Sequence, residues 1–542
     1  NINNQIEDKM RLDEVDLNGK VFRKQKQIPY RNKPKGQPLN GIINKNHVNS
    51  NLYYIINYLF FNNKYRDLNI YQPFIQAIEV LKILINSNKP ILYVGKGANE
   101  SSKLLDEFID KTSIPITTTL HGIGVYAEDN VFSLKMCGMH GNPTANYSLQ
   151  KADVIIALGA RFDDRTTGNI SKYAPNAKHI IHVDIEKSQF NLALKKRKSL
   201  NINIDVEIFL FYCNGLIKQI NEYLPSYIPD GFEMFEDKYF VIGKNQKIYP
   251  NEYDLNIDIC DEDNNPILKD IASHTDKLYY HPDNNFMETL FSLKYDDWLY
   301  WIFEQKNKYK FDYQKFNNDK LSQQHVLSVL GVLLKHSENQ PIITTGVGNA
   351  QMHTTQYIYF KKPKHLITSG SLGVMGVGLP YAIGAKIANP DKNVILIDGD
   401  GSFNMSCNDL ITIKKYNLLI KILILNDESL QMVRCWENLF FDDRVAATDI
   451  KNPNFCMLAE AYGIQSIFCD DQRDLHGTIN QFLKCETSVL MEVKVEKTFC
   501  TPLVKPGHAL DDMLLFDHIK DRTHFNGKKH KDDIHFDGPP PS

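Results

Sequence analysis

The stretch Val394-Ile-Leu-Ile-Asp-Gly-Asp-Gly-Ser402 places an apolar run directly before a glycine-rich acidic turn. The run Ile420–Leu425 repeats this arrangement and ends on Asn426-Asp427. The segment between them predicts a crossover helix, Ser402 to Leu419, with its apolar side at Met405, Leu410, Ile411 and Ile413. A strand, helix and strand in this order form a right-handed unit whose two strand ends open on one edge of a parallel sheet. The sequence therefore predicts an α/β fold at this point.

Asp400 and Asp427 follow these two runs, so both carboxylates are expected at the sheet edge where ligands bind. Two oxygen side chains, a backbone carbonyl and two phosphate oxygens suit octahedral Mg²⁺. Gly399 and Gly401 would let the backbone approach the phosphates. For an isolated Gly-Asp-Gly, ordinary turn chemistry is the better explanation. The spacing of the two runs and the sequence around them favour a metal–diphosphate site instead.

The alternation of strands and helices recurs in two regions of the chain. In the first, a helical apolar stripe starts near Gln76 and is followed by apolar runs at Ile91–Val94, Ile114–Thr117, Val154–Leu158 and Ile180–Val183. In the second, the expected strands are Ile342–Thr344, Leu366–Thr368, Val394–Ile397, Ile420–Leu425 and Val489–Val493. This pattern predicts two doubly wound, parallel-sheet domains.

Composition changes along the chain predict five segments. Residues 1–75 are rich in Asn, Lys and Ile and are expected to be irregular, and residues 76–212 form the first sheet domain. Residues 213–296 contain several prolines and an acidic run, which is typical of a long, partly disordered insertion. Residues 297–505 form the second sheet domain, and residues 506–542, which end in Gly-Pro-Pro-Pro-Ser, are expected to be a disordered tail.

Composition also excludes several classes of protein. The 542 residues are 42% apolar and 23% charged, with a net charge of −3, which gives no case for nucleic acid or an anionic membrane surface. The nine cysteines stand singly without a C-x-x-C pair, which argues against structural zinc and a secreted disulfide framework. The longest apolar stretch, near Leu52–Phe61, is far shorter than the roughly 18 residues of a membrane span. An intracellular location is expected: a plastid or mitochondrion in a eukaryote, otherwise the cytoplasm.

The stretch from Thr345 to Gly463 resembles the diphosphate-binding domain of the acetolactate synthase family. Four motifs occur in the family's order: Ser369-Gly-Ser-Leu-Gly-Val-Met-Gly-Val-Gly-Leu-Pro380, Asp398-Gly-Asp-Gly-Ser-Phe-Asn-Met405, Met432-Val-Arg-Cys-Trp-Glu-Asn-Leu-Phe440 and Pro453-Asn-Phe-Cys-Met-Leu-Ala-Glu-Ala-Tyr-Gly463. Several motifs in the right order make a chance match negligible. The implied cofactor of this domain is thiamine diphosphate with Mg²⁺.

The resemblance assigns roles residue by residue. Asp400, Asp427 and the Ser429 carbonyl would hold Mg²⁺, and Met375 would bend the cofactor so that its amine lies within reach of the reactive carbon. On its own, Met375 would be explained as a core residue. Trp436 would form a wall of the substrate pocket, although without its motif a packing role is equally good. The remaining implied contacts to the cofactor are Val347, Gly348, Asn349, Gly373, Gly399, Gly401, Ser402, Leu430 and Met432.

Residues 89–206 resemble the family's FAD-binding domain. The matching runs are Leu92–Ala98, Gly138–Gly141, Gly159–Arg165, Thr167–Pro175 and His182–Ile185. Gly95 and Gly97 lie in a strand-to-helix turn where backbone N–H groups can meet a diphosphate. Arg161 offers a planar fork for phosphate, and Asp184, at a strand end, can accept ribose hydroxyls.

The resemblance completes the flavin site and adds a substrate residue. It implies that FAD is also contacted by Thr119, Leu120, His121, His140, Gly159, Asp163, Ile185, Asp205 and Val206. Arg165 would grip the carboxylate of the second ketoacid. The alternative for Arg161 and Arg165 is a surface ion pair with Asp163 or Asp164.

The family's reaction joins two 2-ketoacids. Pyruvate loses CO₂ on thiamine diphosphate, and the remaining two-carbon unit is condensed with pyruvate or 2-ketobutyrate, the first common step of branched-chain amino acid synthesis. The resemblance implies a homodimer or tetramer with a regulatory small subunit. Another thiamine-diphosphate enzyme, such as glyoxylate carboligase or pyruvate oxidase, and a non-catalytic homologue remain as alternatives.

The chain departs from the family's pattern at several positions. Ala350 stands where the family has histidine, Asp427 where it has asparagine, Gln431 where it has glycine, and Lys96 in the middle of a glycine triplet. Residues 1–75 show no match to the family's N-terminal pyrimidine-binding domain, which carries the catalytic glutamate. That domain is therefore expected to be absent from this sequence.

Overall fold

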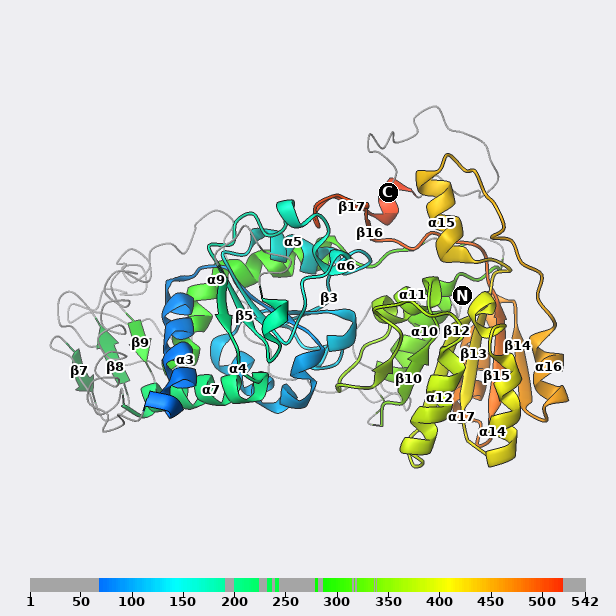
Figure 1. The fold of residues 1–542 in the computed structure, drawn as a ribbon, viewed down its shortest axis with the longest axis horizontal. Helices are drawn as coiled ribbons and strands as arrows, with labels where there is room; N and C mark the ends of the chain where they lie inside the picture. Colours follow the sequence, from blue (N-terminus) through cyan, green and yellow to red (C-terminus); the bar gives the residue numbers. More distant parts are fainter. Residues whose placement is uncertain are drawn as a thin grey trace, which may run out of the picture.

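The computed structural model describes residues 68–519, apart from 191–198, 224–231, 236–238, 243–277, 281–285, 314–315, 317–318, 336 and 338. Two six-stranded parallel sheets, each covered by helices, lie side by side (Figure 1). This arrangement confirms the predicted α/β class with two parallel-sheet domains. The expectations for residues 1–67 and 520–542 lie outside the described residues.

The first sheet has the strand order β3-β2-β1-β4-β5-β6. Its strands are β1 (Pro90–Val94), β2 (Ile116–Thr118), β3 (Ser133–Met136), β4 (Val154–Leu158), β5 (His179–Val183) and β6 (Ser199–Ile202). Because β1 and β4 are buried on both faces, they are continuous apolar runs. The order in which strands join the sheet reverses between the parallel neighbours β1 and β4, which makes that point the expected ligand crevice.

Helices cover both faces of the first sheet. One face packs on α3 (Leu68–Asn86), α4 (Ser102–Thr112) and α7 (Val206–Tyr223). The other face packs on α5 (Pro143–Lys151) and on part of α9 (Phe286–Lys308). The short α6 (Asp164–Thr167) follows β4, and η1 (Lys96–Ser101) and η2 (Leu120–Gly122) follow β1 and β2.

The second sheet has the order β11-β10-β12-β13-β15-β14. Its strands are β10 (Ile342–Thr345), β11 (Leu366–Ile367), β12 (Val394–Gly399), β13 (Lys421–Asn426), β14 (Gln465–Cys469) and β15 (Val489–Lys494). One face packs on α10 (Gln323–Lys335), α11 (Asn349–Tyr357) and α17 (Gln472–Lys484). The other packs on α12 (Gly378–Ala388), α14 (Leu410–Tyr416) and α16 (Phe455–Ala461). Helix α15 (Gln431–Phe440) lies above this sheet in Figure 1.

The crossover between β12 and β13 differs from the predicted single helix. It consists of α13 (Asp400–Phe403), η6 (Cys407–Asp409) and α14. Leu410 and Ile413 are buried as predicted, but Met405 is 60% exposed and Ile411 54% exposed. Half of the expected apolar side therefore faces away from the sheet, so the prediction of one continuous amphipathic helix was wrong.

The structure also places the domain edges differently from the predicted boundaries. Helix α3 begins at Leu68, α7 continues to Tyr223, and α9, which contains position 297, packs on the first sheet. Within the predicted insertion, β7 (Phe232–Phe235), β8 (Tyr239–Ile242) and β9 (Leu278–Tyr280) form an antiparallel sheet. Beyond residue 505, β17 (Met513–Leu514) pairs with β16 (Leu503–Val504), and Leu510 is buried in the core of the first domain. None of the helices in the described part of the chain is long and apolar enough to cross a membrane.

Candidate active site

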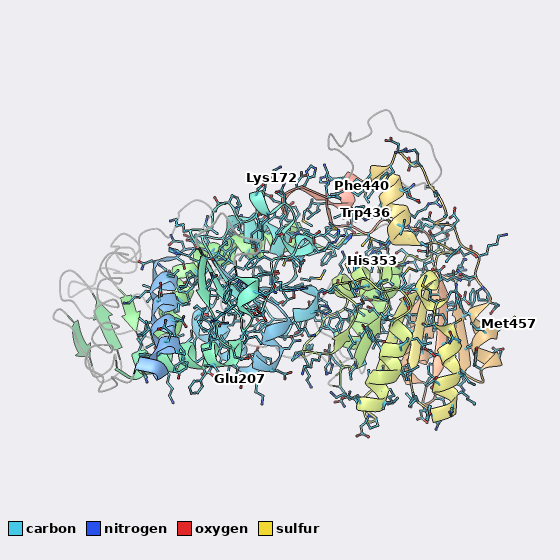
Figure 2. The ribbon with its side chains drawn as sticks, viewed as in Figure 1. Lys172, Glu207, His353, Trp436, Phe440 and Met457 are labelled. Atoms are coloured by element: carbon cyan, nitrogen blue, oxygen red, sulfur yellow. The ribbon has the colours of Figure 1, made fainter. Side chains whose placement is uncertain are left out.

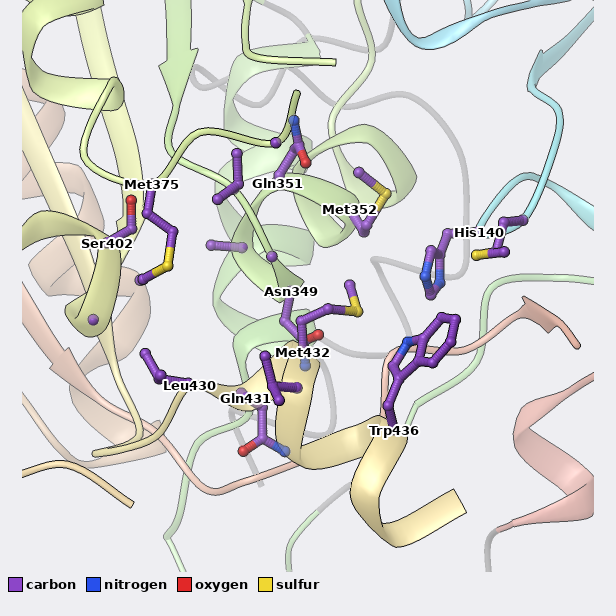
Figure 3. A pocket seen from close by; sticks show the side chains of 18 of the residues that line it. His140, Asn349, Gln351, Met352, Met375, Ser402, Leu430, Gln431, Met432 and Trp436 are labelled. Atoms are coloured by element: carbon purple, nitrogen blue, oxygen red, sulfur yellow. The ribbon is translucent and has the colours of Figure 1, made fainter. Parts of the chain in front are cut away.

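A cavity of about 700 Å³ lies between the two sheet domains. The first domain contributes residues that follow β2, β3 and β4, and the second contributes the loops after β10, β11, β12 and β13 together with α15 (Figure 3). Most of the predicted thiamine-diphosphate residues line it: Val347, Gly348, Asn349, Gly373, Met375, Gly399, Asp400, Gly401, Ser402, Asp427, Ser429, Leu430 and Met432. Arg165 and Trp436, predicted to bind substrate, line the same cavity.

The two predicted metal ligands are each held by an amide side chain. Asp400 begins α13 directly after β12, and its Oδ2 accepts a 2.6 Å hydrogen bond from Asn452 Nδ2. Asp427 follows β13, and its Oδ2 accepts a 2.9 Å bond from Gln323 Nε2. The other oxygen of Asp427, Oδ1, is buried and has no hydrogen-bond partner among the described residues. A cation bound at this oxygen would satisfy it.

The charges at this edge of the sheet also fit a cation. Asp400 is 1% exposed and Asp427 4% exposed. Burial raises the pKa of Asp427 well above its usual value, and the neighbouring Asp400 raises it further. Burial likewise raises the pKa of Asp400, against the hydrogen bond from Asn452. Two buried carboxylates repel each other, and a divalent cation between them would remove that cost.

The described residues contain no cluster of three or more His, Cys, Asp or Glu side chains that could hold a metal. A Mg²⁺ ion here would therefore need oxygens beyond Asp400 and Asp427. The backbone at Ser429 is well placed to supply one, because Ser429 is buried, lines the cavity and is fixed by a bridge to Asp449. Phosphate oxygens and water would complete the coordination.

Glycines leave room for a ligand beside these acids. Gly348 and Gly373 have φ angles of +85° and +61°, which favour glycine. A Cβ atom added at Gly373 or Gly399 would meet nothing within 4 Å, so the space beside their backbone is open. A side chain at either position would fill the cavity that a cofactor needs.

The substrate end of the cavity combines one exposed cation with apolar side chains. Arg165 is exposed, and its Nη1 lies 3.4 Å from the sulfur of Met139. Among the described residues neither Arg165 nor Arg161 forms an ion pair, so the predicted alternative of a pair with Asp163 or Asp164 is not observed. Trp436 packs edge-to-face on Phe440, with ring centroids 5.3 Å apart (Figure 2).

His140 lines the cavity as a neutral imidazole. It is buried, and burial lowers its pKa to about 4. Its Nδ1 lies 3.5 Å from the Cys500 sulfur, and its carbonyl accepts a hydrogen bond from Gln356. The first domain therefore presents an uncharged wall at this point of the cavity.

The predicted flavin residues all lie just beyond the carboxyl ends of strands in the first sheet. They comprise Gly95 and Gly97 after β1, Thr119, Leu120 and His121 after β2, His140 after β3, Gly159, Arg161 and Asp163 after β4, Asp184 and Ile185 after β5, and Asp205 and Val206 after β6. This is the edge where doubly wound sheets bind ligands.

The predicted backbone cradle at Gly95 and Gly97 is not observed. The Gly95 N–H donates to the Leu158 carbonyl and the Gly97 N–H to the Gly159 carbonyl, each at 3.0 Å. A Cβ at Gly97 would lie 2.8 Å from the Gly159 Cα. These glycines therefore serve close packing of two loops, and their amides are already bonded within the protein.

Several other predicted flavin residues also have structural roles. The Asp163 side chain caps α6 by accepting from Thr166 N at 3.2 Å, and the Asp205 side chain accepts from Glu207 N at 2.7 Å. The Val206 side chain is buried in the core, so only its backbone faces the sheet edge.

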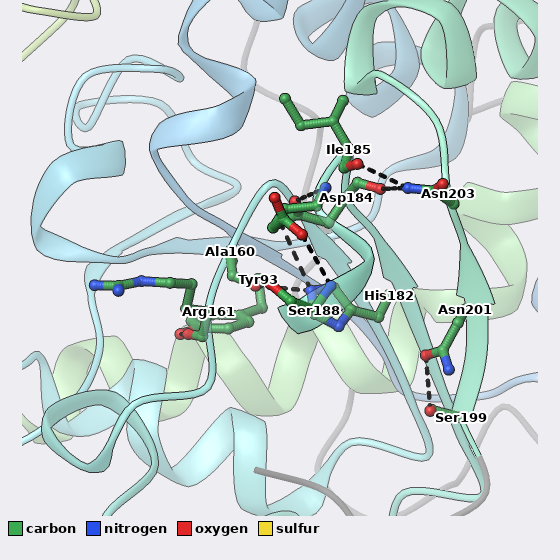
Figure 4. Close-up of polar contacts among 11 residues, drawn as sticks. Tyr93, Ala160, Arg161, His182, Asp184, Ile185, Ser188, Ser199, Asn201 and Asn203 are labelled. Atoms are coloured by element: carbon green, nitrogen blue, oxygen red, sulfur yellow. Dashed lines mark hydrogen bonds and ion pairs between the residues drawn. The ribbon is translucent and has the colours of Figure 1, made fainter. Parts of the chain in front are cut away.

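The loop after β5 suits a ribose and a base (Figure 4). Asp184 Oδ1 accepts from Glu186 N at 2.9 Å, and its Oδ2 lies 4.0 Å from His182 Nε2. Asn203 Nδ2 donates to the carbonyls of Asp184 and Ile185, which holds the loop in place. Ile185 is 70% exposed, so an apolar side chain stands beside a carboxylate with acceptor capacity left.

Gln323 and Asn452, the amides that hold the metal-site acids, were not predicted as site residues. Neither carries a charge, and neither follows an apolar run. Asn452 directly precedes the Pro453 motif, which was the only signal that could have pointed to it. Gln323, at the start of α10, has no such signal and is brought to Asp427 by the fold alone.

Comparisons with known proteins agree with this division into two domains. Residues 77–210 match the family model described as "Thiamine pyrophosphate enzyme, central domain", and residues 346–493 match "Thiamine pyrophosphate enzyme, C-terminal TPP binding domain". The chain is 34% identical over 457 residues to the mitochondrial acetolactate synthase catalytic subunit of Saccharomyces cerevisiae, which covers 82% of this chain and 56% of the relative.

Other relatives give the same picture. The mitochondrial acetolactate synthase catalytic subunit of Aspergillus candidus is 33% identical over 465 residues, covering 84% of this chain and 58% of the relative. Acetolactate synthase 1, chloroplastic, of Zea mays is 31% identical over 446 residues, with coverages of 81% and 58%. The chain thus spans a little over half the length of these relatives.

Proposed function

Because the chain belongs to the thiamine pyrophosphate enzymes of the acetolactate synthase type, we propose that it decarboxylates pyruvate and transfers the two-carbon unit to a second 2-ketoacid. With pyruvate as acceptor the product is 2-acetolactate, and with 2-ketobutyrate it is 2-aceto-2-hydroxybutyrate. The observation that carries the proposal is one cavity lined by the paired acids Asp400 and Asp427 and also by Arg165 and Trp436.

The cofactors of this family are thiamine diphosphate, Mg²⁺ and FAD. When bound, thiamine diphosphate supplies the electron sink for loss of CO₂. The residues present fit it: Asp400, Asp427 and the Ser429 carbonyl would hold the metal, and Gly373 leaves room beside the backbone. FAD would lie along the carboxyl edge of the first sheet, near Asp184.

Residues on opposite sides of the cavity would orient the acceptor ketoacid. The Arg165 guanidinium has no ion-pair partner among the described residues, so it is free to bind the acceptor carboxylate in a bidentate geometry. The Trp436 ring would contact the acceptor's side chain. Neutral His140 and the apolar lining around it would exclude water from the reacting groups.

The described cavity offers no free acid for the pyrimidine ring of the cofactor. Its acidic lining residues are Asp400, Asp427 and Glu437. Asp400 and Asp427 would bind the metal. Glu437 accepts hydrogen bonds from Ala446 N at 3.1 Å and from Thr448 Oγ1 at 2.9 Å. We therefore propose that the activating glutamate comes from a pyrimidine-binding domain outside these residues.

The assembly and its setting are proposed from the relatives. A homodimer or tetramer would pair two copies of the site, with a regulatory subunit as a further partner. Mitochondrial and chloroplastic names among the relatives support a mitochondrion or plastid as the compartment. Branched-chain amino acid synthesis would be the pathway.

The test is product analysis in the presence of a pyrimidine-binding domain on a separate chain. The full chain, supplied with this domain, FAD, Mg²⁺ and thiamine diphosphate, is incubated with pyruvate and 2-ketobutyrate. We expect both acetohydroxyacids, and no product with Asp400→Ala. Acetate without acetolactate would indicate an oxidase, and condensation only in a parallel incubation with glyoxylate would indicate a glyoxylate carboligase. Failure to bind thiamine diphosphate in calorimetry would indicate a non-catalytic homologue.

A further inference from the structure

The first domain has a group of cationic side chains that its fold and core do not use. Lys96 lies between Gly95 and Gly97 at the carboxyl end of β1, and it is exposed. Arg161 lies two residues after Gly159 at the end of β4, and it is also exposed. In this sheet β1 and β4 are neighbours and mark the point where the strand order reverses. The two cations therefore stand on either side of the ligand crevice.

In the described part of the chain, no carboxylate forms an ion pair with either cation, although Asp163 also acts on the nearby His121. Among the described residues Lys96 has neither a hydrogen bond nor an ion pair, and Arg161 makes one side-chain hydrogen bond, from Nη2 to Ser371 Oγ at 3.2 Å. His121 lies in the same region. Its pKa is lowered mainly by burial and, to a smaller extent, by the charges of Lys96 and Arg161. A partly buried imidazole that experiences both charges indicates that the two side chains share one neighbourhood.

Three backbone amides of the loop after β1 are already used within the protein. The N–H groups of Gly95, Gly97 and Ala98 are bonded to carbonyls within the protein. Dinucleotide sites of this topology commonly bind the diphosphate through such amides. With these three amides already bonded, the exposed side chains of Lys96 and Arg161 are the charged donors that the described crevice offers.

We propose that Lys96 and Arg161 form a two-cation clamp for the diphosphate of a dinucleotide, with Lys96 replacing the backbone donors that this loop lacks. The inference rests on the proposed function, because that function names FAD as the dinucleotide. It goes further in assigning Lys96, a departure from the family's glycine, to cofactor binding. Lys96 would bind the diphosphate from the β1 side of the crevice and Arg161 from the β4 side.

Titration of the full chain with FAD tests the clamp. We expect Lys96→Gln, which keeps the stem but loses the charge, to weaken FAD binding about tenfold, since a hydrogen bond to a charged group is of this order. Lys96→Arg should restore most of the affinity. The matched control is Lys103→Gln, an exposed lysine on α4, which should bind FAD like the wild type. Raising the salt concentration should weaken wild-type binding more than that of Lys96→Gln.

ADP separates the clamp from the flavin assignment, because it has the diphosphate without the flavin. If the wild type binds ADP in a Lys96-dependent way but does not bind FAD, the clamp stands and the flavin assignment fails. If Lys96→Gln binds FAD and ADP as the wild type does, at both low and high salt, the clamp is wrong while the flavin assignment stands. An equal loss of FAD affinity in Lys96→Gln and Lys96→Arg would also overturn the clamp. If the charge of Lys96 binds the diphosphate, the arginine variant should keep most of the affinity.

Discussion

Asp427 shows how one residue combines a sequence signal with a structural requirement that the sequence does not reveal. Its place after an apolar run predicted a ligand position at the sheet edge, and the structure puts it beside Asp400 in the cavity. What the sequence could not predict is the amide that orients it. Gln323 lies about a hundred positions earlier, and only the packing of α10 against the sheet brings the two side chains together.

Replacing Gln323 should therefore weaken metal binding without removing a ligand. We expect Gln323→Leu to lower Mg²⁺ affinity about 10–100-fold, the usual cost of losing a group that orients a metal ligand. Calorimetric Mg²⁺ titration at saturating thiamine diphosphate measures it. The neighbouring Gln324→Leu is the control, because Gln324 bonds only to Thr498 and Phe499 in the described structure. Equal Mg²⁺ affinities for the two variants would show that Gln323 does not orient Asp427.

Trp436 carries the prediction for substrate choice. The contact of a flat apolar wall with one extra methylene group changes the relative binding free energy of two substrates by about 1–3 kcal/mol. We expect Trp436→Leu, in an active assembly, to lose preference for 2-ketobutyrate over pyruvate as acceptor. Competition between the two acceptors gives the product ratio directly.

The control for Trp436 is its packing partner. Phe440 packs edge-to-face on Trp436 but does not line the cavity. Phe440→Leu should change stability more than the product ratio. If both variants shift the ratio alike, or Trp436→Leu leaves it unaltered, Trp436 is a packing residue.

At the scale of elements, most strands predicted from the sequence are buried, and the half-buried edge strand β11 is an exception. β1, β4, β12 and β13 are continuous apolar runs because helices cover both sides of them. Within the two parallel sheets, three strands were not predicted: β3, β6 and β14. All three are at sheet edges and mix polar with apolar residues, so no continuous run marks them. Their place in the sheet comes from pairing with a neighbour.

Helix α11 carries a buried base into the centre of the second domain. His353 is fully buried, and its Nδ1 lies 3.2 Å from Gln323 Oε1. Burial lowers its pKa to about 3, with a further contribution from His140. Because the pKa in the folded state is lower than in the unfolded state, the neutral histidine contributes stability above about pH 6.5 that is lost as the pH falls toward 3.

This pKa shift predicts that the free energy of unfolding falls at acidic pH, and that it falls less in the His353→Gln variant. Between pH 7 and pH 5 the titration of His353 should lower the free energy of unfolding of the wild type by about 2 kcal/mol, and the variant should lose correspondingly less. Urea unfolding at the two pH values measures the difference. His476→Gln, on the exposed face of α17, should behave like the wild type. A variant with the same pH dependence as the wild type would contradict the assignment.

For the whole molecule, the two-domain plan was predicted from alternating strands and helices, but the way the domains join was not. The last described segment returns to the first domain, where Val504 N donates to the Met139 carbonyl at 2.7 Å and Leu510 enters the core. Lys135 of β3 donates to the carbonyls of Gln356 and Ile358 in the second domain. Such contacts link residues far apart in sequence, so no local pattern predicts them.

The last prediction concerns the completeness of the catalytic site. The cavity has the metal–diphosphate half of the site, around Asp400 and Asp427, while its third acid, Glu437, is bonded to Ala446 and Thr448. Two copies of the described domains would bring two such halves and no acid for the pyrimidine ring. General acid–base catalysis by such an acid typically increases the rate about 10²–10⁴-fold.

We therefore expect the 542-residue chain alone to bind FAD, to bind thiamine diphosphate weakly and to make almost no acetolactate. Adding a pyrimidine-binding domain should restore turnover, whereas the same domain with its glutamate changed to glutamine should not. Acetolactate formation and flavin absorbance after desalting, measured on the same samples, separate a failure of catalysis from a failure to fold. Robust acetolactate production by the chain alone would contradict this account. It would mean that an acid in residues 1–75 or 213–297 has taken over the role, because those segments contain acidic residues that the described cavity does not include.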